Sequence, residues 1–152
     1  MHESHPSLTP RLGISACLLG ESVRFNGGHK RSALCEELAR HVEFVSFCPE
    51  QAIGLGTPRP AIRLEGTPEA AEARSRDGLA VGGALAEYAR RVAQRADTLD
   101  GFIFMQRSPS CGLQRVKVYS EGGGAPRAEG RGRFAAALCE ALPELPVEEE
   151  GR

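Results

Sequence analysis

Three runs of apolar residues in this chain each lead to a cysteine at the point where a turn begins. The runs and their cysteines are 12–16 with Cys17, 42–47 with Cys48, and 101–105 with Cys111, the last after a short link. Short apolar runs bounded by turn residues are typical of buried strands in an α/β sheet. Because the carboxyl ends of parallel strands meet at one edge of the sheet, the three thiols are expected to converge there.

Helical patterns separate these runs, which predicts an α/β fold with a mostly parallel sheet and helices on both faces. The helices are expected over residues 32–40, 79–99 and 132–142, a fourth strand over 115–119, and a glycine-rich surface loop over 121–130. The predicted architecture is a Rossmann-like, three-layer single domain covering residues 1–152. Residues 1–10 are expected to form a flexible N-terminus, and residues 147–152 a flexible acidic tail.

Charge and composition limit the expected partners. The formal net charge is −1, so we expect no long nucleic acid as a partner. No apolar stretch approaches the roughly 20 residues that a membrane helix needs, so no membrane association is expected. Five cysteines without a secretory signal predict reduced thiols in the cytoplasm rather than a disulfide framework. None of these patterns predicts an oligomeric state.

The five cysteines divide into two groups by position. Cys35 and Cys139 lie inside predicted helices, where cysteine usually packs as a small hydrophobic residue. The three strand-exit cysteines are candidate metal ligands, because thiolates suit zinc, copper(I) and iron–sulfur clusters. The chain lacks the Cys-x-x-Cys pairs of most structural zinc sites and the clustered spacing of ferredoxins. The residues alone therefore predict a soft-metal site with an open coordination position.

Five motifs spread along nearly the whole chain resemble those of the DUF523 family in matching order. They are ISACLLG (14–20), VRFNGGHK (23–30), CPE (48–50), GLGTPRP (54–60) and RSPSCG (107–112). The family includes the thiouracil desulfurases, small bacterial enzymes that remove sulfur from 2-thiouracil. The resemblance implies a [4Fe-4S] cluster held by Cys17, Cys48 and Cys111. It also implies an acidic residue at Glu50 and a serine, at Ser108, near the open iron.

On this interpretation the protein is a desulfurase for a small thiolated nucleobase. A soft thiocarbonyl sulfur would bind the open iron, water would attack C2, and uracil and sulfide would leave without any redox change. Glu50 lies two residues beyond a predicted ligand, so it is expected to transfer a proton. Ser108 is expected to orient water or substrate. Free base, nucleoside and thiolated tRNA all remain open as substrates.

Two other functions remain open from the residues. The first is a non-catalytic iron–sulfur or zinc protein that senses redox state or serves as an accessory module. The second is a metal-free enzyme with a cysteine nucleophile, which would need a base such as His29 close to one thiol. The loop 27–31 suits either an anion-binding turn or a plain glycine turn with solvated cations. Arg59, between two prolines, suits either recognition of a planar or anionic group or a solvated surface position.

Overall fold

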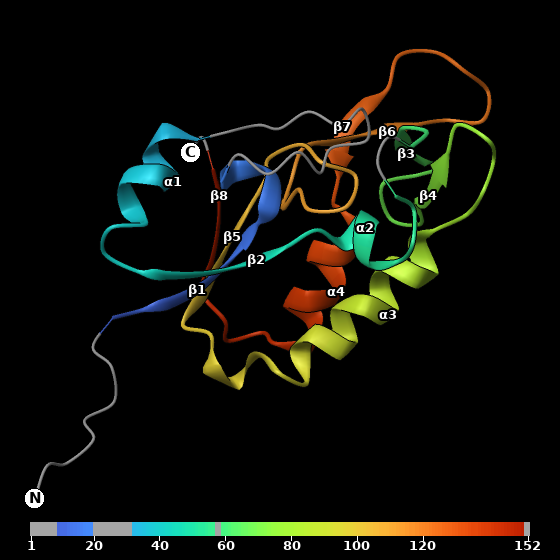
Figure 1. Ribbon diagram of the computed structural model, residues 1–152. Coiled ribbons are helices and arrows are strands. Elements are labelled where there is room, and N and C mark those ends of the chain that lie inside the picture. Colours follow the sequence, from blue (N-terminus) through green and yellow to red (C-terminus); the bar gives the residue numbers. More distant parts are fainter. Residues whose placement is uncertain (1–8, 20–31, 57–58, 151–152) are drawn as a thin grey trace, which may run out of the picture.

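A parallel sheet of four strands organises one side of the molecule (Figure 1). The computed structural model describes residues 9–19, 32–56 and 59–150. The strands, in spatial order, are β2 (Glu43–Phe47), β1 (Arg11–Ser15), β5 (Gly101–Phe104) and β8 (Val147–Glu149). Every pairing between them is parallel. The predicted α/β class is confirmed, and the three strands that lead to Cys17, Cys48 and Cys111 lie side by side.

A second, mixed sheet was not predicted. Its strands, in spatial order, are β4 (Glu72–Ser75), β3 (Ile62–Glu65), β6 (Val116–Tyr119) and β7 (Arg127–Gly130). Only β3 and β6 pair in parallel within it. The expected single sheet is therefore wrong, because the strand predicted over 115–119 belongs here. The predicted loop 121–130 is also wrong in part, since Gly123 and Gly124, both at positive φ, turn the chain back into β7.

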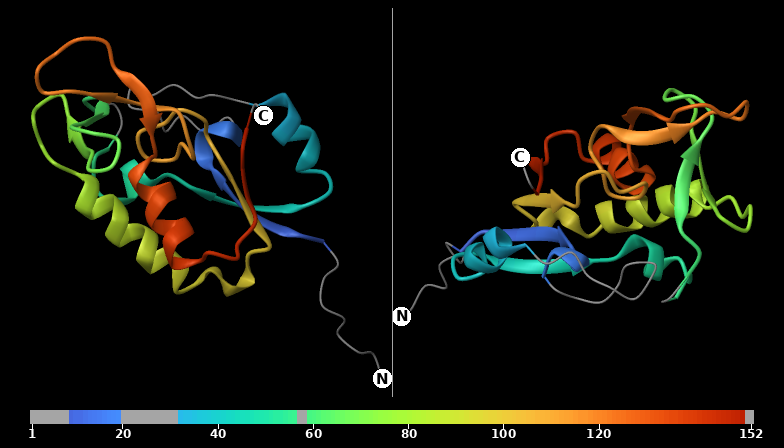
Figure 2. Two further views of the ribbon diagram at one scale, coloured as in Figure 1. Left: turned by 180° about the vertical axis from the view of Figure 1, so that it is seen from behind. Right: turned by 90° about the horizontal axis from the view of Figure 1, so that it is seen from above.

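Helices cover both faces of the parallel sheet. They are η1 (Ala16–Leu19), α1 (Ala33–Leu38), α2 (Pro49–Ala52), α3 (Gly82–Ala93), η2 (Ala96–Thr98) and α4 (Arg133–Ala141). Helices α3 and α4 lie together on one face of the sheet (Figure 2). Phe102 and Phe104 of β5 belong to the same apolar cluster as residues of these two helices. Ile103 points to the opposite face and packs there with Ile14 and Cys35 of α1. The expectation of helices on both faces is thus confirmed, although the helix predicted over 79–99 is shorter.

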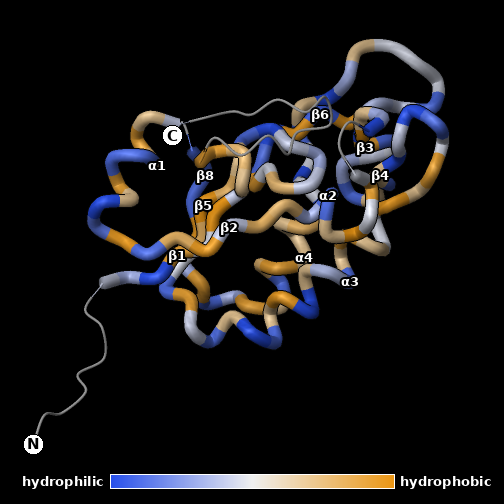
Figure 3. The backbone as a smooth tube through the Cα atoms, viewed as in Figure 1, coloured by the Kyte–Doolittle hydropathy of each residue, from blue (hydrophilic) through white to orange (hydrophobic). Residues whose placement is uncertain are grey.

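One apolar cluster is shared by the two sheets and by helices α3 and α4. It contains Leu64 and Val118 from the mixed sheet, Phe102 from the parallel sheet, and Leu85 and Phe134 from α3 and α4. Hydrophobic residues accordingly concentrate along the central strands β1 and β5 (Figure 3). Within the part of the chain that the structure describes, no helix is long and apolar enough to cross a membrane.

The segment 147–149 is not the flexible acidic tail that its glutamates predicted. It forms β8, in which Val147 pairs with Phe102 in register. The Glu149 side chain is buried, and its Oε2 accepts hydrogen bonds from the backbone N–H groups of Leu113 (2.7 Å) and Gln114 (3.3 Å). These two donors compensate the burial of a carboxylate, which explains how an acidic residue fits a sheet edge.

Some sequence predictions fall on residues that the structure leaves undescribed. These are the flexible termini over 1–8 and 151–152, and the anion-binding loop 27–31 with His29. Of the expected flexible N-terminus, Pro10 is described, and its carbonyl oxygen accepts a hydrogen bond from the Glu43 N–H at 2.8 Å. Pro10 therefore contacts the first residue of β2.

Candidate functional site

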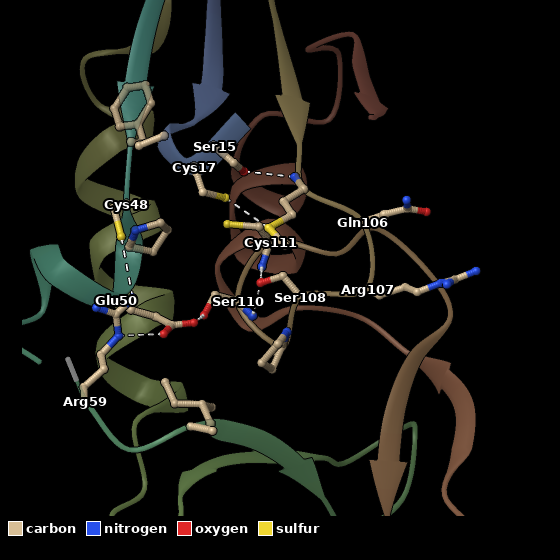
Figure 4. Close-up of a pocket in the computed structure, with 17 residues that line it drawn as sticks. Ser15, Cys17, Cys48, Glu50, Arg59, Gln106, Arg107, Ser108, Ser110 and Cys111 are labelled. Carbon is tan, nitrogen blue, oxygen red and sulfur yellow. Dashed lines mark hydrogen bonds and ion pairs between the residues drawn. The ribbon is translucent and has the colours of Figure 1, made fainter. Parts of the chain in front are cut away.

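The carboxyl ends of β1, β2 and β5 border a cavity of about 290 Å³ (Figure 4). Cys17, Cys48 and Cys111 all line it, together with the predicted catalytic residues Glu50 and Ser108. The convergence expected from the strand exits is therefore observed. These residues meet because β2, β1 and β5 are adjacent and parallel, so that the turns leaving them occupy one edge of the sheet.

Each cysteine is held by a different local structure. Cys17 lies in the single turn of η1 that follows β1, and its Sγ is 3.0 Å from Sδ of Met105. Cys48 is the N-cap of α2, where Pro49 at the first helical position favours the start of a helix. Cys111 lies in the loop after β5 and is buried. Cys17 and Cys111 thus lie in the turns that leave the carboxyl ends of β1 and β5.

The loop that carries Cys111 is shaped by Ser108. The Oγ of Ser108 accepts hydrogen bonds from the backbone N–H groups of Ser110 (3.1 Å) and Cys111 (3.0 Å). The Ser108 carbonyl oxygen also accepts from the N–H of Gly112 at 2.8 Å. A serine that accepts from residues two and three positions ahead stabilises a tight turn. Ser108 therefore shapes the loop as well as lining the cavity.

The first turn of α4 holds the same loop from behind. The backbone N–H groups of Arg133 and Ala135 donate to the carbonyl oxygens of Pro109 and Ser110, both at 3.0 Å. Gly132, the N-cap of α4, packs against the Ser110–Cys111 peptide. These contacts use N–H groups that a helix leaves without intrahelical partners.

Replacing Gly132 with alanine is expected to displace Cys111. A Cβ at this position would lie 2.5 Å from the Ser110 carbonyl oxygen and 2.6 Å from the Cys111 nitrogen, so the loop must move. Overpacking of this kind costs about 1–3 kcal/mol. We expect a lower melting temperature and a lower metal content per chain, measured by differential scanning fluorimetry and iron analysis. Gly83→Ala in α3 is the control, since no atom lies within 4 Å of its added Cβ; equal metal content in both variants would contradict the role of Gly132.

A buried ion pair lies at the edge of the cavity beside Cys48. Nε of Arg59 is 2.9 Å from Oε1 of Glu50, and the Arg59 side chain is 2% exposed. The hydroxyl of Ser110 donates to the other oxygen of Glu50, Oε2, at 2.6 Å. Of the two interpretations of Arg59 that the sequence left open, the solvated surface position is wrong.

Burial raises the pKa of the Cys111 thiol, and the nearby Glu50, Cys17 and Cys48 raise it further. Burial also raises the pKa of Cys48, against the lowering effects of the Gln51 N–H and the Arg59 guanidinium. The protonated thiols therefore predominate in the metal-free protein at neutral pH. Ligation of a metal requires the thiolate, so binding must release these protons.

The metal-free protein is expected to lose stability as the pH rises above the ordinary thiol pKa of 9.0. The folded state keeps Cys111 protonated while the unfolded chain ionises, so this contribution to stability is complete below that pH and is lost above it. The melting temperature should fall between about pH 8 and about pH 10. Thermal melts of Cys111→Ala should show a smaller fall over that range; an identical pH dependence would contradict the assignment.

The donor set fits a polynuclear iron–sulfur core better than a single ion. Three thiols surround one cavity, and thiolates are the ligands of iron–sulfur clusters. Among the residues that the structure describes, no three His, Cys, Asp or Glu side chains are placed to hold one metal ion. A cluster spreads its ligands around a wider core, which agrees with thiols distributed around a cavity. The remaining cysteines, Cys35 and Cys139, lie outside this cavity, and Cys35 packs in the apolar core as predicted.

Several features of the site were missed from the sequence. The pairing of Ser110 with Glu50 joins residues 60 positions apart, and no local pattern indicates it. Met105 was read as part of an apolar run, but it lines the cavity. One feature of the sequence could have pointed to Arg59 as a partner of Glu50. Arg59 lies in a stiff segment between two prolines, close in sequence to Cys48 and Glu50.

Known proteins resemble this chain in sequence and in fold. The family model described as 2-thiouracil desulfurase matches residues 12–150. "Uncharacterized protein YbbK" of Bacillus subtilis (strain 168) is 33% identical over 107 residues, which are 65% of this chain and 71% of that protein. Among solved structures, the [4Fe-4S]-dependent thiouracil desulfidase TudS is similar, with a TM-score of 0.73 and 28% identity. That match covers 93% of this chain and 91% of TudS.

Proposed function

Because the chain belongs to the 2-thiouracil desulfurase family, we propose that it is a [4Fe-4S]-dependent enzyme that converts 2-thiouracil and water into uracil and hydrogen sulfide. The observation that carries this function is the meeting of three thiols with the partly buried carboxylate of Glu50 at one cavity. The reaction changes no oxidation state, since the C2–S bond is replaced by a C2–O bond. We place it in the cytoplasm, where thiols stay reduced.

Cys17, Cys48 and Cys111 would hold the cluster, since they are the thiols around the cavity. When bound, the cluster supplies a Lewis-acidic iron with an open position for a soft thiocarbonyl sulfur. The Cys17 and Cys111 side chains are buried, which excludes bulk water from that side of the site. Glu50 and Ser108, both partly exposed, line the same cavity as these thiols and would face the substrate.

Glu50 is the proposed proton-transfer residue. The Glu50 side chain is 15% exposed at the cavity edge, so it can reach substrate and water while most of it is shielded from solvent. It accepts a proton from the attacking water, and that proton then goes to the departing sulfur or to a ring nitrogen. A positioned carboxylate of this kind contributes typically about 10²–10⁴-fold to rate.

Ser108 is the proposed hydrogen-bond donor to the substrate. Its oxygen already accepts two backbone N–H groups, so its lone pairs are occupied. The hydroxyl proton is what Ser108 can still offer, and the residue lines the cavity. Ser108 is therefore suited to bind an acceptor atom of the pyrimidine ring or of water, and is unsuited to act as a base.

The test is anaerobic reconstitution with iron and sulfide, followed by incubation with 2-thiouracil. We expect a brown protein, release of sulfide, and formation of uracil in equal amount, followed by colorimetric sulfide assay and chromatography. A cluster without sulfide release would favour a sensing or accessory protein instead. A colourless protein that still releases sulfide would favour a cysteine nucleophile.

A further inference from the structure

We infer that Arg59 and Ser110 are positioning residues that hold opposite oxygens of the Glu50 carboxylate, and that Arg59 links this carboxylate to Cys48. The inference rests on the proposed function, in which Glu50 transfers a proton and Cys48 is a ligand. It gives roles to Arg59 and Ser110, which neither the sequence nor the family resemblance assigned. It also explains why an arginine is buried at the edge of the site.

At this edge of the cavity, Arg59 contacts Glu50, Gly56 and Cys48 among the residues that the structure describes. Its Nε donates to Glu50 Oε1 at 2.9 Å, and its Nη1 donates to the carbonyl oxygen of Gly56 at 2.5 Å. Its Nη2 lies 4.0 Å from Sγ of Cys48. A guanidinium is planar and always charged, so the first two contacts fix the direction of the third. Arg59 therefore places a positive charge between the proposed proton-transfer residue and a proposed ligand.

Ser110 holds the other side of the carboxylate. Its hydroxyl donates to Glu50 Oε2 at 2.6 Å, and its side chain is almost fully buried. The Ser110 backbone is itself held, because its carbonyl oxygen accepts from Ala135 of α4 at 3.0 Å. Glu50 is thus clamped between the segment after α2 and the loop after β5. A carboxylate bonded at both oxygens has one orientation, which supplies the preorganisation that proton transfer needs.

Ser108 and Ser110 therefore have different roles although they flank the same proline. The Ser108 oxygen accepts from backbone N–H groups, whereas the Ser110 hydroxyl donates to a side chain. Loss of the Ser108 side chain should disturb the loop that carries Cys111. Loss of the Ser110 hydroxyl should leave that loop intact and release one oxygen of Glu50.

The experiment compares Arg59→Met, Arg59→Lys and Ser110→Ala with the wild type, all reconstituted anaerobically. We measure kcat and KM for 2-thiouracil, iron and sulfide per chain, and the reduction potential of the bound cluster. Arg63→Met and Ser120→Ala are the matched controls. Arg63 has an ion pair of the same 2.9 Å length with Glu65, and Ser120 donates to the carbonyl oxygen of Gly123 at 2.6 Å; neither lines the cavity.

For Arg59→Met and Ser110→Ala we expect kcat to fall by about 10- to 100-fold, the range typical of residues that orient reactive groups, with KM unchanged. Arg59→Lys should recover part of kcat, because it restores the charge without the planar fork. Arg59→Met should also lower the reduction potential, since a positive charge beside Cys48 favours the reduced cluster. Ser110→Ala should leave the potential unchanged.

A rise in KM with unchanged kcat in Arg59→Met would show that Arg59 binds substrate, and would overturn its positioning role. An unchanged potential in that variant would overturn the link to Cys48. Full kcat in Ser110→Ala would overturn the role of Ser110. A wild type that carries the cluster but releases no sulfide would refute the proposed function, while the potential of Arg59→Met would still decide whether the guanidinium acts on Cys48.

Discussion

Alanine at Cys17, Cys48 or Cys111 is expected to give a colourless protein that releases no sulfide from 2-thiouracil. The three thiols line one cavity, and no fourth cysteine lies there to replace a lost ligand. Thiolates supply the bonds that hold an iron–sulfur core, so two of them should not retain it through turnover. Iron analysis, visible absorption and sulfide release should therefore all fall to background in each variant.

Cys35 and Cys139 provide the controls for this prediction. Both are thiols outside the cavity, the first buried against Ile14 and Leu18 and the second in α4. Cys139→Ala should keep full iron content and activity. Cys35→Ala should lower thermal stability because it leaves a small void, yet keep the brown colour. Loss of colour in Cys139→Ala, or its retention in Cys111→Ala, would refute the assignment of the ligands.

Glu50→Gln is expected to lower kcat by about 10²–10⁴-fold while the cluster stays intact. The amide has nearly the shape of the carboxylate, so it can still accept from Arg59 or Ser110, but it cannot take a proton from water. Glutamine is preferable to alanine here, since removing one partner of a buried ion pair costs about 3–5 kcal/mol. Sulfide release and visible absorption, measured on the same sample, distinguish a loss of catalysis from a loss of the cluster.

Arg74→Gln is the control for Glu50→Gln, because it alters an ion pair of the mixed sheet. Arg74 is 3.8 Å from Glu65, and its side chain is exposed. It should leave kcat and the cluster unchanged. Wild-type kcat in Glu50→Gln would remove Glu50 from the proton transfer, and a loss of absorbance would show that Glu50 supports the cluster instead.

The sequence predicted the positions of those site residues that directly follow a strand. Cys17, Cys48 and Cys111 each follow an apolar run, and neighbouring parallel strands bring such exits together. Glu50 was implied by the family resemblance, and it lies two residues beyond Cys48. The partners of Glu50 did not follow, because Arg59 and Ser110 reach it from separate loops after α2 and β5.

The fold was less predictable at its second sheet and at β8. Val116 and Val118 alternate with exposed Lys117, a pattern that indicates a half-buried strand without saying which sheet it joins. Three consecutive glutamates usually indicate a solvated segment. At Glu149 the burial depends on two N–H groups in the turn just beyond Cys111, and such pairing is invisible in a local pattern.

The hydrogen bonds of Glu149 have a consequence for biosynthesis. Glu149 lies 36 residues beyond Leu113, the residue it anchors, and Leu113 closely follows Cys111. Until the ribosome has added Glu149, the loop that carries Cys111 has no support from β8. Iron delivery before β8 has been synthesised would therefore meet an incomplete centre, and maturation should follow the synthesis of Glu149.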